Sequence, residues 1–597
     1  MSEGPEHVSS FWRTTISRRA ALRGGVIGGA GLAAAALIGC GDDDEEEPAA
    51  TAAPTQAPAA TPEATPTPDP EAAKFGGTYR RATNGTPETL DPHRTQSHTT
   101  KGASAQIHSF LFKQIAATFE NAPNAQMAGD LAESWEFTPD GLTLNIQLRG
   151  DAKYTAPISR AVDSEDVQFS IARFLGTDGS EGAPNAVQLD FIDTVATPDA
   201  GTATLGFNRV FARALWRMAD VFNMAIMPRE TGSAYDPTQT MVGSGAWMWD
   251  ELKDGVSWTV QRNPDWHNGP LPYIEKVQDV VLERAQQLTQ FQAGNIDHIN
   301  TIAPDAVPGL LSNFPEGRIE PRKSLGFGYI SRGEPRDGSA PWDDPRVRQA
   351  MSMALDRDTM IEGLYNVQNL ESVGLDVSSR VGWHNILPAG YAGQSIDPRE
   401  DAAATGRYIQ YNVAEANKLM QAAGQGDGFS VPYHYTTRYG TAWSLEAEII
   451  PTYMQEIGID FQITIDDFAS VYTPMTFRGE FEGVAFQLQA FPDLGDYLSE
   501  MYRPGAGRNH SKVEDQAIVD AVLDINSTVD AEERNDKIQG IQRDLLIEPM
   551  WYVPSVAWQL NWQGLNKRIQ TPEAWHGNGR GGEAVFAWPW WWIDQDA

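Results

Sequence analysis

Side chains that could perform acid–base or metal chemistry do not form a known catalytic pattern in this chain of 597 residues. The neighbouring acids Asp466 and Asp467 could act as a general acid and base. In a chain with 80 acidic residues, however, such neighbours are more often solvated surface residues. The sequence has no His-Glu-x-x-His, Gly-x-Ser-x-Gly or phosphate-loop motif, and its ten histidines lack metal-ligand spacing. The absence of these motifs weakens an enzymatic interpretation without excluding it, and we predict no metal site.

A glycine-rich segment near the C-terminus matches the pattern of a dinucleotide-binding loop, GNGRGG at residues 577–582. Only fifteen residues follow it, too few for the βαβ unit that such a loop requires. We interpret this segment as an ordinary loop. The tryptophans of the following segment, 588–592, are predicted to pack over the last strand or helix.

Length, charge and cysteine content exclude several further classes of protein. The chain is long enough for about three or four domains at roughly 150 residues each. Its 80 acidic and 45 basic residues give a net charge of −35, which disfavours binding to nucleic acid. A single cysteine excludes an internal disulfide framework, a zinc site built from cysteines and a redox pair.

That cysteine, Cys40, directly follows an apolar, glycine-rich run over residues 24–39. The run is too short for a spanning helix, which needs about 20 residues. Leu37-Ile38-Gly39-Cys40 resembles the lipobox of bacterial lipoproteins, in which the cysteine is lipidated and becomes the mature N-terminus. The alternative is a free cysteine in a discarded leader. Acyl chains contribute about 0.8 kcal/mol per buried CH₂ group, so they would hold the protein at a membrane.

Arg18 and Arg19 lie in a segment, Ser17–Leu22, that resembles the twin-arginine export signal. An ordinary secretory signal remains the alternative. We predict a signal peptide over residues 1–39 and a tether over 40–75, because that segment is first acidic and then rich in Pro, Ala and Thr. The protein is therefore expected to be exported and lipid-anchored to the outer face of the cytoplasmic membrane.

Two local patterns begin the body of the chain. An Asp-Gly turn at 140–141 separates Trp135 from the alternating residues 142–148, which predicts a β-hairpin with one buried face. Asp163 and Asp166 then predict the capped start of a helix. The apolar side of this helix consists of Val167, Ile171, Phe174 and Leu175.

Further helices and a strand follow. Asp344 and Pro345 begin a predicted helix with apolar residues recurring through Ile361, and Arg346 and Arg348 fall largely off that apolar stripe. Another helix runs from the cap Asn412, with Glu415 closing a capping-box-like arrangement, to Gly424. Residues 461–465 alternate as a strand after a helical stretch at 445–457. The class is α/β or α+β, without a regular parallel βαβ rhythm.

These segments, in this order, resemble the extracytoplasmic solute-binding proteins of ABC importers, in the family with oligopeptide-, dipeptide- and nickel-binding members. The similarity covers nearly everything from Gly76 to about Pro554. The motifs that carry it are Gly76–Arg80, Pro87–Pro92, Leu131–Glu136, Ser164–Ser170, Gly243–Trp247, Arg262–Trp266, Phe291–Asp297 and Asp344–Arg357.

The resemblance implies an α/β, two-lobed fold of the periplasmic-binding-protein type II kind with an additional α/β domain. Lobe I would comprise residues 76–119, 241–325 and 556–597, the extra domain 120–240, and lobe II 326–555. A hinge would let the lobes close on a solute, and a membrane permease would recognise the closed form. The implied protein is not an enzyme and needs no cofactor. It is a monomer that binds a solute, a permease and, through its lipid, the membrane, but no nucleic acid.

The resemblance also nominates residues for the ligand cleft. They are Phe327, Tyr329, Thr436, Arg438, Trp443, Phe468, Gln487, Gln489 and Phe491. Peptide-binding members place a carboxylate, for the peptide's ammonium group, shortly before an Asp-Pro-like pair. Here the corresponding stretch has no acidic residue between Glu482 and Asp493, and neutral Gln487 and Gln489 stand at alternate positions.

This difference favours an oligosaccharide or another neutral or blocked solute over a free peptide, although a peptide-like solute stays open. Nickel is not excluded, but no histidine cluster supports it. Two other functions remain as alternatives: a secreted lipid-anchored hydrolase, and a receptor that presents its ligand to a membrane sensor.

Overall fold

The structure is a computed structural model that describes residues 74–595, apart from 84, 115–126, 325, 392, 492, 557–558 and 572–587. The predicted signal peptide with Arg18 and Arg19, the lipidation site Cys40, nearly all of the tether and the loop at 577–582 lie outside these residues. Within the described part of the chain, no helix has the length and apolar character needed to cross a membrane.

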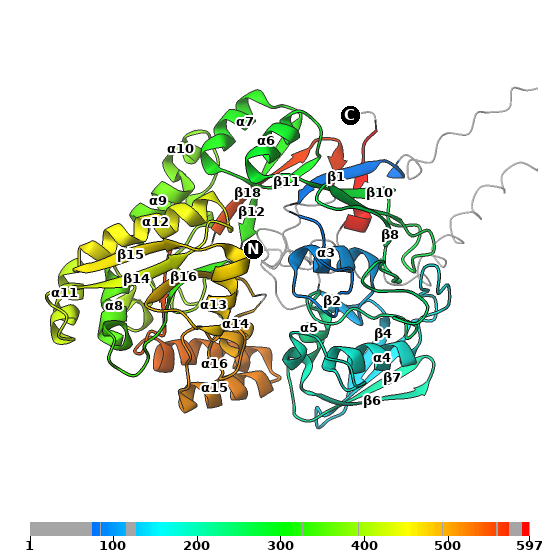
Figure 1. The fold of residues 1–597 in the computed structure, drawn as a ribbon, viewed down its shortest axis with the longest axis horizontal. Helices are drawn as coiled ribbons and strands as arrows, with labels where there is room; N and C mark the ends of the chain where they lie inside the picture. The colour runs from blue at the N-terminus through cyan, green and yellow to red at the C-terminus, as the bar shows by residue number, and fades with distance from the viewer. Residues whose placement is uncertain are drawn as a thin grey trace, which may run out of the picture. The chain divides into compact units, whose positions relative to one another are not determined.

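A seven-stranded mixed sheet is assembled from distant parts of the sequence (Figure 1). Its strand β1 is parallel to both β10 and β11, and the other pairs are antiparallel. In spatial order the strands are β12 (Gly317–Ser324), β18 (Gln559–Asn566), β11 (His298–Ile302), β1 (Thr78–Thr83), β10 (Lys276–Val281), β9 (Ser257–Arg262) and β8 (Trp247–Lys253).

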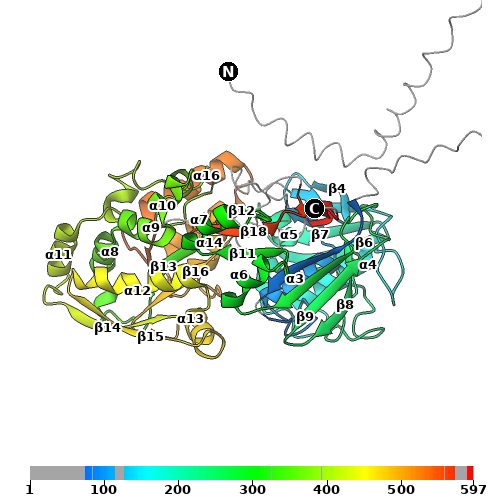
Figure 2. The ribbon, with the colours of Figure 1, turned by 90° about the horizontal axis from the view of Figure 1, so that it is seen from above.

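A five-stranded sheet uses the sequence between β12 and β18. Its strand β14 is parallel to β15 and to the central strand β16, whereas β13 is antiparallel to β16 and β17. In spatial order the strands are β15 (Ile459–Ile465), β14 (Phe429–Tyr435), β16 (Val484–Gln489), β13 (Phe327–Arg332) and β17 (Tyr552–Pro554). Figure 2 shows β14 and β15 side by side at the edge of this sheet.

A four-stranded antiparallel sheet has a core of its own. Its order is β4 (Ala132–Phe137), β5 (Thr143–Leu148), β7 (Thr202–Phe207) and β6 (Ile192–Asp199). The predicted hairpin is confirmed as β4 and β5, and the alternate residues Leu144, Ile146 and Leu148 are buried. Short pairs are formed by β2 (Phe112–Gln114) with β3 (Met127–Gly129) and by β19 (Ile569–Gln570) with β20 (Trp592–Ile593).

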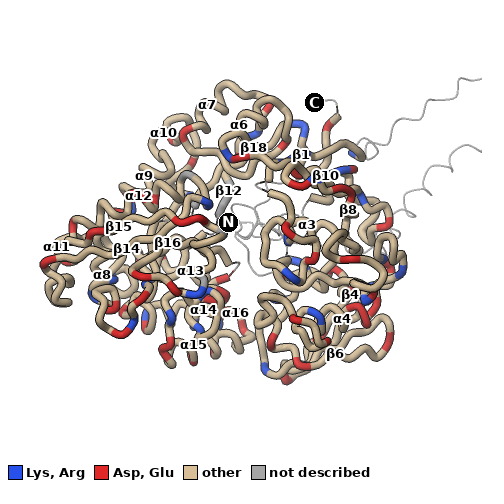
Figure 3. The backbone as a smooth tube through the Cα atoms, in the orientation of Figure 1, with Lys and Arg blue, Asp and Glu red and all other residues tan. Residues whose placement is uncertain are grey.

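Helices accompany all three sheets. They are α3 (His98–Ile107), α4 (Ser164–Leu175), α5 (Ala214–Ala219), α6 (Arg284–Gln292), α7 (Val307–Asn313), α8 (Pro345–Ala354), α9 (Arg357–Tyr365), α10 (Val367–Ser372), α11 (Val413–Ala422), α12 (Thr441–Gln455), α13 (Thr473–Arg478), α14 (Leu494–Met501), α15 (Gln516–Ser527) and α16 (Ala531–Ile541). Acidic and basic positions are interspersed along the described chain (Figure 3).

Within the described residues, the chain passes directly between the seven-stranded and five-stranded sheets twice, from β12 to β13 and from β17 to β18. The two passages lie side by side, because β12 pairs with β18 in one sheet and β13 pairs with β17 in the other. Between these pairs, the amide of Ser555 donates to the carbonyl of Gly328 at 3.0 Å. The sheets are thus joined by a two-stranded ribbon.

The predicted start of α4 is confirmed. Asp163 accepts hydrogen bonds from the amides of Glu165 and Asp166, and the Asp166 carboxylate accepts one from the Asp163 amide. This reciprocal capping box satisfies amides that the first turn leaves without helical partners.

The predicted helix from Asp344 to Ile361 is wrong in its length. The helix α8 ends at Ala354, and Asp356 caps a new helix, α9, by accepting the amide of Thr359. Arg348 is also not a peripheral residue, since it is only 4% exposed. Its guanidinium donates to the carbonyls of Trp342, Pro549 and Met550, so long-range carbonyls satisfy a side chain that local periodicity placed off the core.

The helix α11 and the strand β15 are confirmed with two differences. Asn412 accepts the amide of Glu415, but the Glu415 carboxylate pairs with Lys418 at 2.9 Å, so the capping box is only half formed. In β15, Ile463 and Ile465 are about half exposed, at 51% and 57%, because this strand lies at the sheet edge.

Two of the C-terminal tryptophans are packing residues as predicted, but they cover β1, the first described strand, and not the last strand or helix. Trp588 and Trp591 are buried, and both place their rings edge-on against Tyr79 of β1, with ring centroids 5.9 Å apart in each pair. The guanidinium of Arg81 stacks over Trp588 at 4.2 Å. The end of the chain is therefore fixed against the centre of the seven-stranded sheet.

Candidate functional site

Four of the predicted cleft residues meet on one face of the five-stranded sheet. Phe327 pairs with Gln489, and Tyr329 pairs with Gln487, in the antiparallel register of β13 and β16. Residues two apart on a strand share a face, and directly paired residues lie on the same side. All four side chains are buried.

The two glutamines differ in how their polar atoms are satisfied. The amide nitrogen of Gln487 donates to the hydroxyl of Ser331 at 2.6 Å, whereas its carbonyl oxygen is buried and has no hydrogen-bond partner among the described residues. On the same face, the hydroxyl of Tyr329 is 3.1 Å from Nδ1 of His510. Burial raises the pKa of Tyr329 well above its ordinary value, so the phenol stays neutral.

Phe491 continues this face into an aromatic cluster. Its ring meets Tyr497 edge-on at 4.8 Å, and its carbonyl accepts a hydrogen bond from Tyr391. Tyr497 also contacts Phe327, with ring centroids 6.0 Å apart. The cluster holds the chain rigidly just beyond the end of β16.

Trp443 and Thr436 are not part of this face. Trp443 stacks on Phe486 with centroids 4.1 Å apart, and Phe486 precedes Gln487 in β16, so Trp443 lies on the opposite side of the sheet. The indole nitrogen of Trp443 donates to the carbonyl of Thr436 at 2.9 Å. Both residues are buried in packing that anchors the loop between β14 and α12.

Phe468 and Arg438 lie near that loop. Tyr439 bridges the group, because it contacts Trp443 at 5.2 Å and Phe468 at 5.5 Å. Arg438 is exposed. Burial of Arg284, at the start of α6, lowers its pKa, and the charge of Arg438 lowers it further. The structure thus separates the predicted residues into a glutamine face and a loop group.

A buried ionic cluster at the start of α14 was not predicted. Arg213 lies 3.1 Å from Asp493 and 2.6 Å from Asp496, and Arg217 lies 2.9 Å from Asp496. Although burial lowers it, the charges of Asp493 and Asp496 raise the pKa of Arg213. No local pattern signals this cluster, because its partners are almost 300 residues apart in sequence.

The interpretation of Asp466 and Asp467 as solvated surface residues holds only for Asp467, which caps the turn at 468–472 by accepting the amide of Ser470. Asp466 is buried, and its carboxylate is 2.9 Å from Nδ1 of His434. The sequence interpretation missed this because the partner comes from the neighbouring strand β14.

Glu446 is a second buried acid that sequence analysis did not identify. It lies on α12, where its carboxylate accepts hydrogen bonds from the hydroxyl of Ser555 at 2.5 Å and from the amide of Val556 at 3.4 Å. Burial raises the pKa of Glu446 to about 7. Arg357 donates to the carbonyls of Pro554 and Ser555. Two buried side chains, Glu446 and Arg357, therefore hydrogen-bond to the passage from β17 to β18 in the ribbon that joins the sheets.

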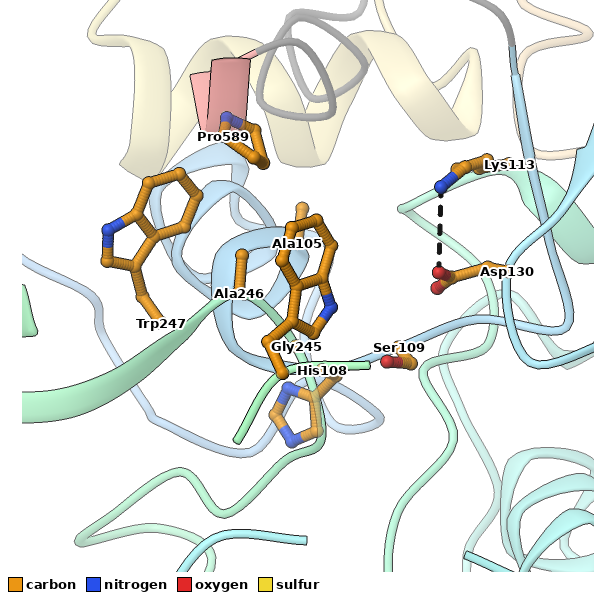
Figure 4. A pocket seen from close by; sticks show the side chains of 10 residues that line it. Ala105, His108, Ser109, Lys113, Asp130, Gly245, Ala246, Trp247 and Pro589 are labelled. Carbon is orange, nitrogen blue, oxygen red and sulfur yellow. Dashed lines mark ion pairs between the residues drawn. The ribbon is translucent and has the colours of Figure 1, made fainter. Parts of the chain in front are cut away.

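A small cavity of mixed apolar and polar lining lies beside α3 (Figure 4). His108, Ser109, Lys113 and Asp130 contribute polar groups to its lining, and Lys113 is 3.9 Å from Asp130. Burial opposes ionisation of Asp130, but a hydrogen bond from His267 and the charge of Lys113 lower its pKa to about 2. At about 30 Å³ the cavity has room for about two water molecules and not for an organic solute.

Comparison with known proteins identifies the family. Residues 126–509 match the family described as "Bacterial extracellular solute-binding proteins, family 5 Middle". Heme-binding protein A of Haemophilus influenzae is 24% identical over 353 residues, which cover 55% of this chain and 59% of that protein. Di/tripeptide-binding protein 1 of Pseudomonas aeruginosa is 23% identical over 497 residues, covering 77% of this chain and 85% of that protein.

The fold is shared with solved structures. The periplasmic binding protein AgaA from A. tumefaciens R10, in complex with agropinic acid, superposes with a TM-score of 0.71 at 22% identity, covering 87% of this chain and 99% of that chain. The mixed α/β fold predicted from the sequence is therefore confirmed, and the hydrolase alternative is wrong because the matching family consists of solute-binding proteins. The chain belongs to family 5 of the bacterial extracellular solute-binding proteins, and it is the substrate-binding component of an ABC importer.

Proposed function

We propose that this protein captures a peptide-like or oligosaccharide-like solute without a free ammonium group, in a cleft between two lobes, and delivers it to a membrane permease. Lobe I would comprise residues 76–119, 241–325 and 556–597, lobe II would comprise 326–555, and the extra domain 120–240. The three larger sheets support this division, since the strands of each fall within one of these three groups of residues, whereas the short pair of β2 and β3 connects lobe I to the extra domain.

The observation that carries the choice of solute is the chemistry at and beyond the end of β16. The first acidic residue there, Asp493, is already neutralised by Arg213 and also accepts hydrogen bonds from Gln394 and the amide of Gly495. A buried ammonium group would therefore lack a carboxylate partner at this strand, at a cost of several kcal/mol. The buried oxygen of Gln487, in contrast, can accept a hydrogen bond from a hydroxyl or amide group.

We further propose that export and lipidation place the protein on the outer face of the cytoplasmic membrane. The support is the order of the sequence features: Arg18 and Arg19, then an apolar run, then Cys40, then the tether. A proline-rich tether extends by about 3.1 Å per residue, which gives the body reach to a permease in the same membrane.

A thermal-shift screen of the purified protein tests the proposed solute. The panel contains di- to pentapeptides in free and N-acetylated form, oligosaccharides and nickel. A solute at 100 times its dissociation constant adds about 2.7 kcal/mol to the free energy of unfolding. We expect N-acetylated peptides or oligosaccharides to raise the melting temperature. Stabilisation by free peptides alone would show that the ammonium group has another partner and would overturn the proposed solute class.

A further inference from the structure

A buried ionic contact joins the four-stranded-sheet region to the helices beside the five-stranded sheet (Figure 1). Arg213, the residue that precedes α5, is held between Asp493 and Asp496 of the α14 start, and the side chains of all three are at most 4% exposed. Arg217 on α5 adds contacts of 2.9 Å to Asp496 and 3.9 Å to Glu500. Five charged groups therefore come together from two parts of the fold.

Neutral hydrogen bonds extend the same contact. The amide of Ala212 donates to the carbonyl of Asn526 at the end of α15, at 2.9 Å. The side chain of Gln188 donates to Glu500. The contact thus involves two segments on one side, around residues 188 and 212–217, and two helices on the other.

The residues of this contact are separate in sequence from the ribbon that joins the sheets. The ribbon comprises the passages from β12 to β13 and from β17 to β18, and none of the charged groups of the contact belongs to it. Bending of a ribbon of this kind moves the parts that it joins as rigid bodies. The four-stranded-sheet region is tied to the part that carries the seven-stranded sheet, because β2 pairs with β3 and the amide of Thr155 donates to the carbonyl of Gly243. A contact between this region and the five-stranded-sheet part is therefore broken when the two parts separate and is formed again when they close.

The geometry points to a closure latch: the pairs of Arg213 and Arg217 with Asp493, Asp496 and Glu500 hold the extra domain against lobe II in the closed arrangement and must separate to admit a solute. This inference rests on the proposed function, because it assigns a role in the closure of the cleft. Asp493 is two residues from Phe491, a predicted cleft residue, so the latch and the site share one segment of chain.

A latch and an ordinary structural ion pair should respond differently when one charged partner is removed. Removing one partner of a buried pair leaves an uncompensated charge. In a rigid core this charge would unfold the protein, whereas at a hinged interface opening allows water to hydrate it. Arg213→Ala should therefore open the protein while its sheets remain folded.

Spin labels can measure the opening directly. In the full chain with Cys40→Ser, Val187→Cys and Val529→Cys place labels on exposed positions, 56% and 70% exposed, near the two sides of the contact. Without any solute, we expect double electron–electron resonance to show longer distances in Arg213→Ala than in the parent. Circular dichroism of the two proteins should match. If one tenth of the molecules remain closed, the dissociation constant of a solute rises about tenfold.

Arg209→Ala is the matched control, because Arg209 forms an exposed pair with Asp190 in the same segment. It should leave the distance distribution unchanged. Glu500→Gln is a milder variant that keeps Arg213 in place, and it should give a smaller shift in the same direction even if Arg213→Ala does not fold. Unchanged distances in both latch variants would overturn the latch. Because the spin-label measurement needs no solute, its failure is distinguishable from a failure of the solute screen.

Discussion

At the scale of single residues, burial of the Glu446 carboxyl group makes the stability of the protein depend on pH. Glu446 is 4% exposed, and the hydroxyl and amide that it contacts only partly offset the cost of burying its carboxylate. The folded protein therefore binds a proton at Glu446 more tightly than the unfolded chain, because the pKa rises from 4.5 to about 7.

The sign of the resulting pH dependence follows from linkage. As the pH rises from about 4.5 to 7, the contribution of Glu446 lowers the free energy of unfolding, by up to about 3 kcal/mol above pH 7. Glu446→Gln removes this dependence, so its stability relative to the parent should increase over this range in urea unfolding. Glu448→Gln, on the exposed side of the same helix, is the control. Parallel pH curves for the parent and Glu446→Gln would contradict the assignment.

Cys40 allows a second test of a single residue. Its lipidation would contribute about 0.8 kcal/mol per buried CH₂ group to membrane binding. We expect Cys40→Ala to move the exported protein from the membrane fraction to the soluble fraction in cell fractionation. If exported Cys40→Ala stays in the membrane fraction after its signal segment has been cleaved off, the proposed lipid anchor is contradicted.

The outcome for single residues shows where sequence patterns stop being informative. The caps Asp163, Asp344 and Asn412 could be predicted, because a cap depends on amides within three residues. The burial of Arg348 and Asp466 could not, because their partners lie on other elements. Which of the nominated residues share a face depended on the register of β13 and β16, which local sequence does not specify.

For secondary-structure elements, local capping provides a direct measurement. Asp163→Ala removes the half of the capping box in which the Asp163 carboxylate accepts the amides of Glu165 and Asp166, together with a 2.7 Å contact with Arg229, but keeps the backbone amide that donates to Asp166. We expect a loss of about 1 kcal/mol in the free energy of unfolding, measured by urea denaturation. Glu165→Ala, in the same helical turn but with a 61% exposed side chain, should cost less than about 0.5 kcal/mol. Equal losses for the two variants would show that the cap is not the stabilising group.

Elements with strong local patterns were predicted well, and their ends less so. The hairpin of β4 and β5 could be predicted because an Asp-Gly turn precedes residues that alternate strictly, although the bulge between Ala132 and Ser134 could not. The break between α8 and α9 was missed because the apolar spacing continues through it to Ile361, while Asp356 starts a new cap. The apolar periodicity therefore predicted which side of the two helices is buried, but not the break in the chain between α8 and α9.

For the whole molecule, the arrangement of the sheets could be anticipated only through resemblance to a family. The seven-stranded sheet combines strands from residues 78–83, 247–324 and 559–566, and no local signal specifies that β1 lies between β10 and β11. The two passages between the sheets would form the hinge of the proposed closure, and Glu446 and Arg357 hydrogen-bond to the passage from β17 to β18. The buried contact at Arg213 supplies an opposing restraint.

Isothermal titration of the purified protein with one tripeptide, in free and N-acetylated form, tests the central claim most directly. The account predicts that the N-acetylated form binds with one solute per chain and at least ten times more tightly, because Asp493 is held by Arg213 and no other acid follows β16 before it. Tighter binding of the free form would contradict the account, since it would require a buried carboxylate that is available to the ammonium group.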